Sequence, residues 1–304
     1  MTSPVLITGA STGLGLALAK RLASDARYHL VLTARAGSLH RFAAAGVHEG
    51  ERLWIRSLDV RSDAERRAIV REVERELGGV DVLVNNAGVA YRAVVEHVRE
   101  EERLAQMEVN FRAPMELVRC VLPGMRERRR GRIVAISSVA GMMAMPTMAV
   151  YAASKFALEG AHEALYYETR PWGIHVTLVQ PGFIRADTFD LVRRTALSER
   201  AEADAADPYH AHYASMGGFI ERAMRRLAWS DHDDVARVVE RTIRRASPPL
   251  RVLATPDARL FAALRRWLPR RLYHGLLYRM LPGVRSWGPA SRRLELAAPE
   301  PLDG

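Results

Sequence analysis

A tyrosine, a lysine and a serine are the residues of this sequence best suited to proton transfer. Tyr151 and Lys155 are four residues apart, so they share one face if their segment is helical. Lys155 is one of only two lysines in a chain whose other cations are arginine. Its compact ammonium can approach a phenol and lower the phenol pKa from about 10 toward neutrality, which suits general acid–base catalysis. Ser138, in the preceding segment, can donate a hydrogen bond to a substrate oxygen that gains charge.

A glycine-rich segment near the N-terminus is typical of a phosphate-binding turn. The apolar run at residues 4–8 leads into TGASTGLG, and a helical pattern follows at once. Glycines let the backbone turn tightly and approach a diphosphate, while the helix N-terminus supplies free N–H groups. We therefore predict a dinucleotide cradle made by Gly9, Ser11, Thr12, Gly13, Leu14 and Gly15.

Three further strand ends supply candidates for cofactor contacts. The second apolar run ends at Arg35 with no acid nearby to bind the ribose of NAD, so Arg35 favours the extra phosphate of NADP. Asp59, followed by Val60, ends the third run and can meet the adenine amino group. Small residues after the fourth run would let the backbone pass beside the nicotinamide ribose: Asn86, Ala87 and Gly88. A surface arginine, a turn or a cap is the alternative interpretation of these positions.

The alternation of apolar runs and helical patterns predicts an α/β fold. We expect strands at residues 4–8, 29–33, 52–58, 80–84, 132–137, 174–179 and 250–253. We expect helices at residues 14–23, 63–77, 100–128, 151–170 and 233–244, the third of them broken near Pro114 or Pro123. The strands are continuous apolar runs, which is typical of a parallel sheet covered on both faces. This pattern predicts a Rossmann-type, doubly wound parallel sheet over residues 1–255 and a C-terminal helical extension over residues 256–304.

Composition narrows the classes of partner and site. The chain has 304 residues and a net charge of +10, but the bias toward arginine is global and we find no nucleic-acid-binding motif, so we expect no nucleic-acid partner. The single cysteine, Cys120, and the lack of a signal peptide or spanning apolar run suggest a cytoplasmic location. His210 and His212 have no cysteine or paired carboxylates beside them, so we expect no metal site.

Together these motifs resemble those of the short-chain dehydrogenase/reductase family. They occur in the family's order over residues 4–254: TGASTGLG at 8–15, NNAG at 85–88, MEVN at 107–110, ISSVAG at 136–141, YAASK at 151–155 and QPG at 180–182. The stretch YAASKFALEG, and the gap from Ser138 to Tyr151, are most similar to the steroid and retinol dehydrogenase branch.

The resemblance implies an enzyme that interconverts an alcohol and a ketone or aldehyde with a nicotinamide cofactor, which Arg35 predicts to be NADP(H). It implies that Tyr151 is the acid/base, and that Lys155 binds the nicotinamide ribose and lowers the tyrosine pKa. Ser138 would position the substrate oxygen, and Asn110 would hold a water that relays protons to Lys155.

The resemblance also implies that a loop near residue 182 contacts the cofactor, and that the enzyme is a homodimer. The loop residues are Pro181, Gly182 and Ile184. The family often has a threonine four residues after this glycine, whereas this chain has Ala186 there and Thr188 two residues later. The dimer would form by pairing of the helices at 100–126 and 151–170 with their symmetry mates.

A methionine-rich loop between Ser138 and Tyr151 indicates an apolar substrate. Its methionines offer a soft, adaptable wall: Met142, Met143, Met145 and Met148. We expect a steroid, retinoid, terpenoid or long-chain carbonyl compound, with Phe183 and Phe189 as a lid; packing of a core or dimer surface is the alternative for the methionines. Two other functions remain open, a ketoreductase of polyketides or 3-oxoacyl thioesters and a cofactor-bound sensor. The intact serine–tyrosine–lysine–asparagine set argues against the sensor.

The C-terminal extension is basic and apolar. Residues 258–293 contain arginines, leucines and aromatic residues at roughly helical spacing, interrupted at Pro269 and Pro282, and contain no acid. Such a helix can lie in the interface of an anionic membrane, so we predict peripheral membrane contact. The alternatives are that its apolar face folds back over the substrate pocket or pairs with another subunit.

Overall fold

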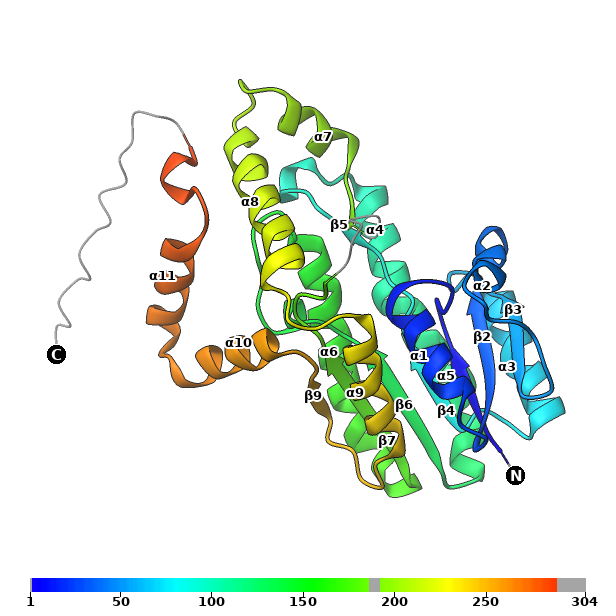
Figure 1. Cartoon of the computed structure of the whole chain (residues 1–304). Helices are drawn as coiled ribbons and strands as arrows, with labels where there is room; N and C mark the ends of the chain where they lie inside the picture. Colours follow the sequence, from blue (N-terminus) through cyan, green and yellow to red (C-terminus); the bar gives the residue numbers. More distant parts are fainter. Residues whose placement is uncertain (1, 186–191, 289–304) are drawn as a thin grey trace.

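The computed structural model describes residues 2–185 and 192–288, and its centre is a parallel sheet of seven strands (Figure 1). The strands are β1 (Ser3–Ile7), β2 (Tyr28–Ala34), β3 (Leu53–Ser57), β4 (Val82–Asn85), β6 (Gly131–Ile136), β7 (Ile174–Gln180) and β9 (Arg251–Leu253). Their order across the sheet is β3-β2-β1-β4-β6-β7-β9. The chain leaves β1 toward one edge and returns through β4 toward the other, so the order reverses between these two strands. In such sheets, ligands bind at the carboxyl ends of the strands beside this reversal.

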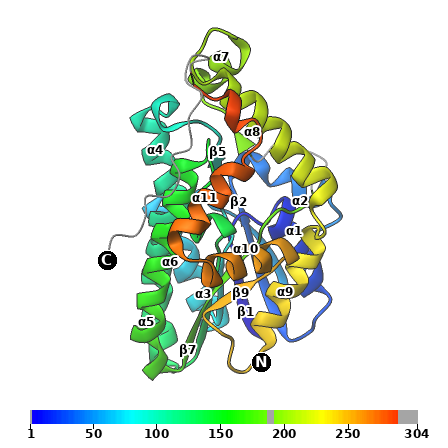
Figure 2. The ribbon, with the colours of Figure 1, turned by 90° about the vertical axis from the view of Figure 1, so that its left-hand side faces the viewer.

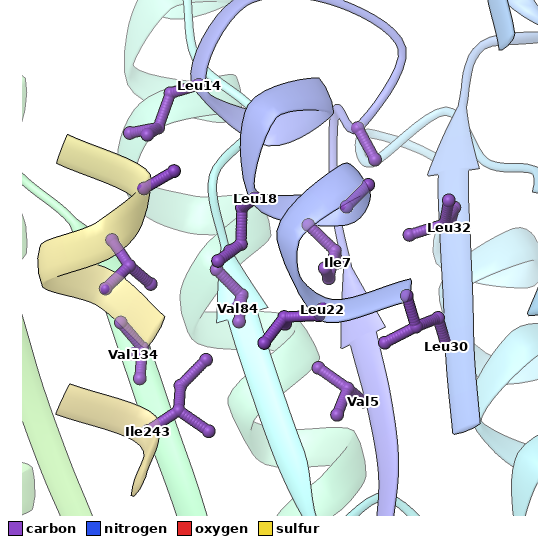
Figure 3. Close-up of a cluster of buried hydrophobic side chains, with 14 of the residues drawn as sticks. Val5, Ile7, Leu14, Leu18, Leu22, Leu30, Leu32, Val84, Val134 and Ile243 are labelled. Atoms are coloured by element: carbon purple, nitrogen blue, oxygen red, sulfur yellow. The ribbon is translucent and has the colours of Figure 1, made fainter. Parts of the chain in front are cut away.

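Helices cover both faces of the sheet, which confirms the predicted doubly wound architecture. One face carries α1 (Gly13–Ala23) and α9 (His232–Arg244), and the other carries α3 (Asp63–Leu77), α5 (Ala113–Glu127) and α6 (Ala149–Thr169). Successive residues of β1 face opposite layers. Val5 and Ile7 pack under α1 and α9 (Figure 3), whereas Leu6 belongs to the core on the other face. Burial on both faces explains why the strands read as continuous apolar runs.

The long helix expected at residues 100–128 is three elements. They are α4 (Glu100–Met107), a π-helical turn η3 (Glu108–Arg112) and α5. Pro114 has no N–H to donate to the carbonyl of Asn110 four residues earlier, which removes one α-helical hydrogen bond where the register changes. Pro123 lies inside α5, which continues through it. The break therefore lies at Asn110, just ahead of Pro114.

Several shorter elements stand above the carboxyl ends of the strands (Figure 1). They are β5 (Ala90–Tyr91), which pairs with β8 (Val192–Arg193), α7 (Ala196–Ala203), α8 (His210–Arg222) and a second π-helical turn η6 (Ala223–Leu227). A short helix, α2 (His40–Ala44), follows β2 and the 3₁₀ turn η1 (Ala36–Ser38); η2 (Val95–His97) and η5 (Arg170–Trp172) are further 3₁₀ turns. Sequence analysis predicted no strand or helix between residues 180 and 232.

The C-terminal extension is an arm of two helices on the β9 side of the molecule (Figures 1 and 2). It consists of α10 (Pro256–Trp267), α11 (Arg270–Met280) and the 3₁₀ turn η7 (Val284–Ser286). Tyr273 is buried and its hydroxyl lies 3.8 Å from the sulfur of Met143, while Trp287 donates a 2.9 Å hydrogen bond to Ser215 on α8. The extension therefore packs back onto the methionine loop and onto α8. Among the described residues, no helix is both long and apolar enough to cross a membrane.

Candidate active site

The glycine-rich segment forms the turn between β1 and α1, at the carboxyl edge of the sheet. Gly9 and Gly13 have φ angles of 63° and 53°, in the left-handed region that favours glycine. A Cβ atom on Gly9 would lie 2.9 Å from the Cα atom of Ala87. One on Gly15 would lie 2.4 Å from the carbonyl oxygen of Gly9. A side chain at Gly9 or Gly15 would therefore displace the turn.

The N-terminus of α1 remains open to a ligand. Its N-cap, Thr12, is extended and makes no side-chain capping bond among the described residues, and the first turn contains no acid. The first N–H groups of the helix thus keep their hydrogen-bonding capacity, and the helix dipole adds partial positive charge. The turn and helix together fit the diphosphate of a dinucleotide.

Thr8 and Asn86 bind this turn to the segment that follows β4. The Thr8 hydroxyl accepts hydrogen bonds of 3.0 Å from the N–H groups of Asn86 and Ala87. The Asn86 side-chain amide donates to the carbonyl oxygens of Thr8 and Gly9, both at 2.9 Å. Two segments that the sequence suggested separately thus form one unit. Sequence analysis did not single out Thr8, although its place just before the first glycine was a usable signal.

Arg35 and Asp59 follow the carboxyl ends of the neighbouring strands β2 and β3. Arg35 is exposed, and its side chain has no hydrogen bond or ion pair within the described part of the chain. The Asp59 carboxylate accepts a 2.6 Å hydrogen bond from the guanidinium of Arg61. Hydrogen bonds from Arg61, and then the charge of Arg35, hold the pKa of Asp59 below its usual value. Arg35 is thus available to an anion, whereas Asp59 already shares its carboxylate.

Tyr151 and Lys155 project from the first turns of α6, and β6 brings Ser138 to the same place. The Lys155 ammonium lies 5.8 Å from the centre of the Tyr151 ring and donates a 2.8 Å hydrogen bond to the carbonyl of Ile136. Ser138 begins the 3₁₀ turn η4 (Val139–Gly141), where its hydroxyl oxygen accepts a 3.1 Å hydrogen bond from the Ala140 N–H. The Ser138 side chain also forms a hydrogen bond with Tyr151.

Burial governs the electrostatics of this group. It raises the pKa of Tyr151 above the usual value, and the hydrogen bond with the Ser138 side chain opposes the rise. It lowers the pKa of Lys155 to about 8, and the negative charge of Glu159 opposes the fall. The sequence predicts that Lys155 lowers the pKa of Tyr151. In this arrangement the ammonium bonds to the Ile136 carbonyl and burial is the larger effect, so that role of Lys155 stays a prediction.

Asn110 is buried in the π-helical turn η3 and joins two parts of the site. Its side-chain oxygen accepts a 2.9 Å hydrogen bond from the Val89 N–H, and its amide donates to the Val89 carbonyl at 2.8 Å. The same amide donates to the Ser154 hydroxyl at 3.0 Å. A Cβ atom on Gly88 would lie 3.4 Å from the Asn110 oxygen and 4.0 Å from the Lys155 ammonium. The structure therefore brings Asn110 and Lys155 together at Gly88, and π-helical turns of this kind are frequent at functional sites.

The loop after β7 is fixed by the start of α10. The Gly182 N–H donates a 2.9 Å hydrogen bond to the Thr255 hydroxyl, and the Phe183 N–H donates a 2.8 Å hydrogen bond to the Asp257 carboxylate. A Cβ atom on Gly182 would lie 2.0 Å from an Asp257 oxygen, so a side chain at this position would displace the Asp257 carboxylate. Ile184 bridges to the segment before α9. Sequence analysis missed Thr255 and Asp257, since their partners are more than 70 residues away. The predicted positions Ala186, Thr188 and Phe189 lie outside the described residues.

The methionine loop lies between Ser138 and α6, under the C-terminal arm. Met143 is buried against Tyr273, and the other three loop methionines are half-buried: Met142, Met145 and Met148. Phe183 lies across from Phe219 of α8 with their ring centres 6.3 Å apart. Apolar side chains from the loop, α8 and α11 thus lie on the side of the site next to Ser138. Within the described residues, no group of three or more His, Cys, Asp or Glu side chains is arranged to hold a metal ion.

Comparison with known protein families agrees with this geometry. A model described as short chain dehydrogenase matches residues 3–196 of the chain. The chain belongs to the short-chain dehydrogenase family. The match spans the glycine-rich turn, the segment after β4 and the serine, tyrosine and lysine of the site. Membership of this family makes the protein an oxidoreductase.

Three curated relatives of this short-chain dehydrogenase cover most of its length. Human retinol dehydrogenase 8 is 38% identical over 254 residues, which are 81% of this chain and 79% of the relative. The 3-ketodihydrosphingosine reductase of Bacteroides thetaiotaomicron is 34% identical over 266 residues, 87% and 93% of the two chains. Human 17-beta-hydroxysteroid dehydrogenase type 1 is 34% identical over 257 residues, which are 83% of this chain and 77% of the relative. The chain is therefore similar to the retinol and steroid dehydrogenase branch.

Solved structures of short-chain dehydrogenases share the fold. A Streptomyces avermitilis enzyme has a TM-score of 0.74 and 28% identity, covering 90% of this chain and 100% of its own. A metagenomic short-chain oxidoreductase in complex with NADP has a TM-score of 0.60 and 28% identity, and the match covers 83% of this chain and 96% of that one. A Burkholderia phymatum enzyme in complex with NAD has a TM-score of 0.71 and 27% identity, and the match covers 91% of this chain and 95% of that one. The family binds a nicotinamide cofactor, and these neighbours include complexes of both kinds.

Proposed function

We propose that this protein is an NADP(H)-dependent oxidoreductase that interconverts an alcohol and a ketone or aldehyde on a bulky apolar substrate. The observation that carries the proposal is the convergence of Ser138, Tyr151 and Lys155 beside an open, glycine-lined turn. The relatives support the reaction class, because they include a retinol dehydrogenase, a hydroxysteroid dehydrogenase and a keto-lipid reductase.

The proposed chemistry divides among four side chains, while a bound nicotinamide supplies or accepts the hydride. Tyr151 donates its proton to the carbonyl oxygen during reduction and takes it back during oxidation. The Ser138 hydroxyl donates a hydrogen bond to the same oxygen and stabilises the charge that develops there. Lys155 holds the nicotinamide ribose. Asn110 holds a water for proton relay, at a π-helical turn where Pro114 cannot donate to the Asn110 carbonyl.

The choice of NADP(H) rests on Arg35. This arginine follows β2, at the position where dinucleotide folds hold the adenosine ribose, and no described residue pairs with it. A guanidinium forms two parallel hydrogen bonds with a phosphate, which suits the 2′-phosphate of NADP(H). The remaining cofactor contacts that we propose are those of the turn, the segment after β4 and the loop after β7.

The proposed substrate is apolar because of the side chains next to Ser138. The half-buried loop methionines, Phe183 and the buried Tyr273 offer little that could pair with a charged group. Methionine and aromatic side chains adapt to steroid, retinoid, terpenoid or long-chain carbonyl shapes. The names of the relatives point to the same class.

We also propose that the enzyme is a homodimer. The outer face of α6 carries exposed Phe156 and Tyr167, with Gly160 between them in open space. Exposed Leu104 lies on α4, which contacts α6. An apolar face of this kind on two neighbouring helices is suited to pairing with its symmetry mate.

The outer face of the C-terminal arm is the surface that we propose for membrane contact. Leu272, Leu276 and Met280 are spaced four residues apart along α11 and are exposed, as is Trp267 at the end of α10. Residues 258–288 contain no acid, and arginines flank the apolar side chains: Arg259, Arg265, Arg266, Arg271, Arg279 and Arg285. An apolar stripe with arginines beside it fits the surface of an anionic bilayer, where a lipophilic substrate would be concentrated.

A panel of substrates tests the proposed function. Purified protein is mixed with ketones, aldehydes, alcohols and a 3-oxoacyl thioester, each with NADPH or NADH in the reductive direction and with NADP or NAD in the oxidative one. The absorbance of the reduced nicotinamide reports turnover. We expect the highest kcat/KM with an apolar carbonyl or alcohol and the phosphorylated cofactor. Preference for the thioester would favour the ketoreductase interpretation, and the absence of any turnover would favour the sensor.

A further inference from the structure

Glu159 is a buried acid one helical turn beyond Lys155 on the same face of α6. Its side chain is 5% exposed. One carboxylate oxygen accepts a 2.9 Å hydrogen bond from the Gln180 amide, and the other accepts a 2.8 Å hydrogen bond from Arg251 of β9. A buried carboxylate is costly unless it is paired, and these two donors, one of them a cation, favour its charged form. Neither the proposed reaction nor the cofactor cradle uses this charge.

The negative charge of Glu159 acts on Lys155, one of the residues of the proposed reaction. The lysine is 6% exposed, and its hydrogen bond goes to a neutral carbonyl. The negative charge of Glu159 opposes the effect of burial, which lowers the pKa of Lys155 to about 8. Because this pKa is close to physiological pH, a modest change in either effect, burial or the charge of Glu159, alters the fraction of Lys155 that is charged.

Glu159 also contacts the two loops that border the reacting groups. Gln180 is the last residue of β7 and directly precedes Pro181 and Gly182 of the cofactor loop. On the other side, a Cβ atom on Gly141 would lie 2.8 Å from the Cγ atom of Glu159. The turn that begins at Ser138 therefore rests on this side chain.

The other polar groups around Glu159 leave it as the buried negative charge beside Lys155. Arg251 also pairs with Glu163 at 2.7 Å, but the Glu163 side chain is 45% exposed, so solvent screens it. His162 is fully buried, and burial lowers its pKa to about 4, so it is neutral at physiological pH. Ser137, which faces the same turn, carries no charge.

We propose that Glu159 is a positioning residue that keeps Lys155 charged for the cofactor ribose and anchors the Ser138 turn and the Gln180 loop around it. This inference rests on the proposed function, because it assigns to the lysine the task of binding ribose. Arg251 sets how much of the Glu159 charge reaches Lys155, since its guanidinium bonds directly to the carboxylate whose negative charge opposes the effect of burial on Lys155.

The test measures NADPH affinity against pH, by fluorescence of the bound cofactor, in a Tyr151→Phe background where the phenol cannot titrate. The parent should bind more weakly as pH rises through a midpoint near 8, where the lysine loses its charge. Glu159→Gln should move that midpoint down by about one pH unit, because loss of the acid destabilises the ammonium. At pH 8 the affinity should fall about fivefold, as the charged fraction drops from about one half to about one tenth.

Three variants serve as controls. Glu163→Gln removes the other acid that binds Arg251 and should leave the midpoint within about 0.3 units. Glu159→Asp should restore most of the parental midpoint. Arg251→Gln frees the carboxylate for Lys155 and should move the midpoint up, which keeps the proposal testable if Glu159→Gln does not fold.

The outcomes separate this inference from the proposed function. A midpoint unchanged in Glu159→Gln, lowered equally by Glu163→Gln, or not raised in Arg251→Gln overturns the role of Glu159 while the enzyme assignment stands. Affinity that does not depend on pH in the parent has the same consequence. A wild-type protein that binds neither NADPH nor NADH overturns both.

Discussion

Asn110→Ala should destabilise the protein and loosen the site together. The substitution removes three hydrogen bonds of 2.8–3.0 Å, two to the backbone of Val89 and one to Ser154. Each contributes about 1 kcal/mol net, and the donors and acceptors left behind are poorly placed to reach water. We therefore expect the free energy of unfolding to fall by about 3 kcal/mol. For a chain of 304 residues, with an unfolding entropy of about 2.1 cal/mol/K per residue, that loss corresponds to a fall in Tm of about 5 °C.

Thermal and urea unfolding measure this loss, and Gln106→Ala provides the comparison. Gln106 is also buried and also donates to the Val89 carbonyl, but this is a single hydrogen bond of 3.4 Å, whereas Asn110 makes two shorter ones to Val89. Its loss should weaken the Val89 anchorage less, so NADPH affinity should fall in Asn110→Ala and change little in Gln106→Ala. An unfolding free energy for Asn110→Ala within about 1 kcal/mol of wild type would refute the anchoring role.

Three further outcomes concern the cofactor, the assembly and the arm. Arg35→Asp should raise the kcat/KM ratio of NADH to NADPH at least about tenfold; an unchanged ratio would leave Arg35 a surface residue. Sedimentation at micromolar concentration should show twice the 34.0 kDa chain mass, and a monomer alone would argue against pairing through α4 and α6. Trp267→Ser with Leu272→Ser should reduce co-sedimentation with anionic vesicles, as should added salt, whereas Trp172→Ser should not. Equal recovery of the wild type, the double variant and Trp172→Ser with the vesicles would contradict membrane docking by the arm.

Local chemistry explains which parts of the fold the sequence could predict. The seven predicted strands form the observed sheet, and its inner strands were predictable because each is an apolar run that is buried on both faces. The turn after β1 was predictable because glycine spacing reports backbone conformations that other residues avoid, as the φ of Gly9 shows. The pairing of Tyr151 with Lys155 followed from helical periodicity alone.

Contacts between distant segments explain what the sequence did not show. The bond from Phe183 to Asp257, and the contact of Met143 with Tyr273, join residues 74 and 130 positions apart. No local pattern reports such partners. The π-helical turn at Asn110 was hidden for a related reason, because Pro114 indicated a break but not its register.

Glu159 illustrates a second limit. In the sequence it is an acid in an alanine-rich helical segment, of the kind found on the solvent-exposed face of many helices. Only the fold reveals that β7 and β9 direct Gln180 and Arg251 toward it. Side-chain periodicity places a residue on a face of a helix, but the neighbouring elements decide whether that face is buried.

Tyr151→Phe tests the central claim most directly. The substitution removes one hydroxyl, so cofactor binding should persist while turnover of the preferred substrate falls at least about a hundredfold. Tyr167→Phe, on the exposed face of the same helix, should match wild type and serves as the control. The assay is the change in absorbance of the reduced nicotinamide at saturating cofactor. Turnover by Tyr151→Phe above about a tenth of the wild-type rate would contradict the assignment of Tyr151 as the proton-transfer residue.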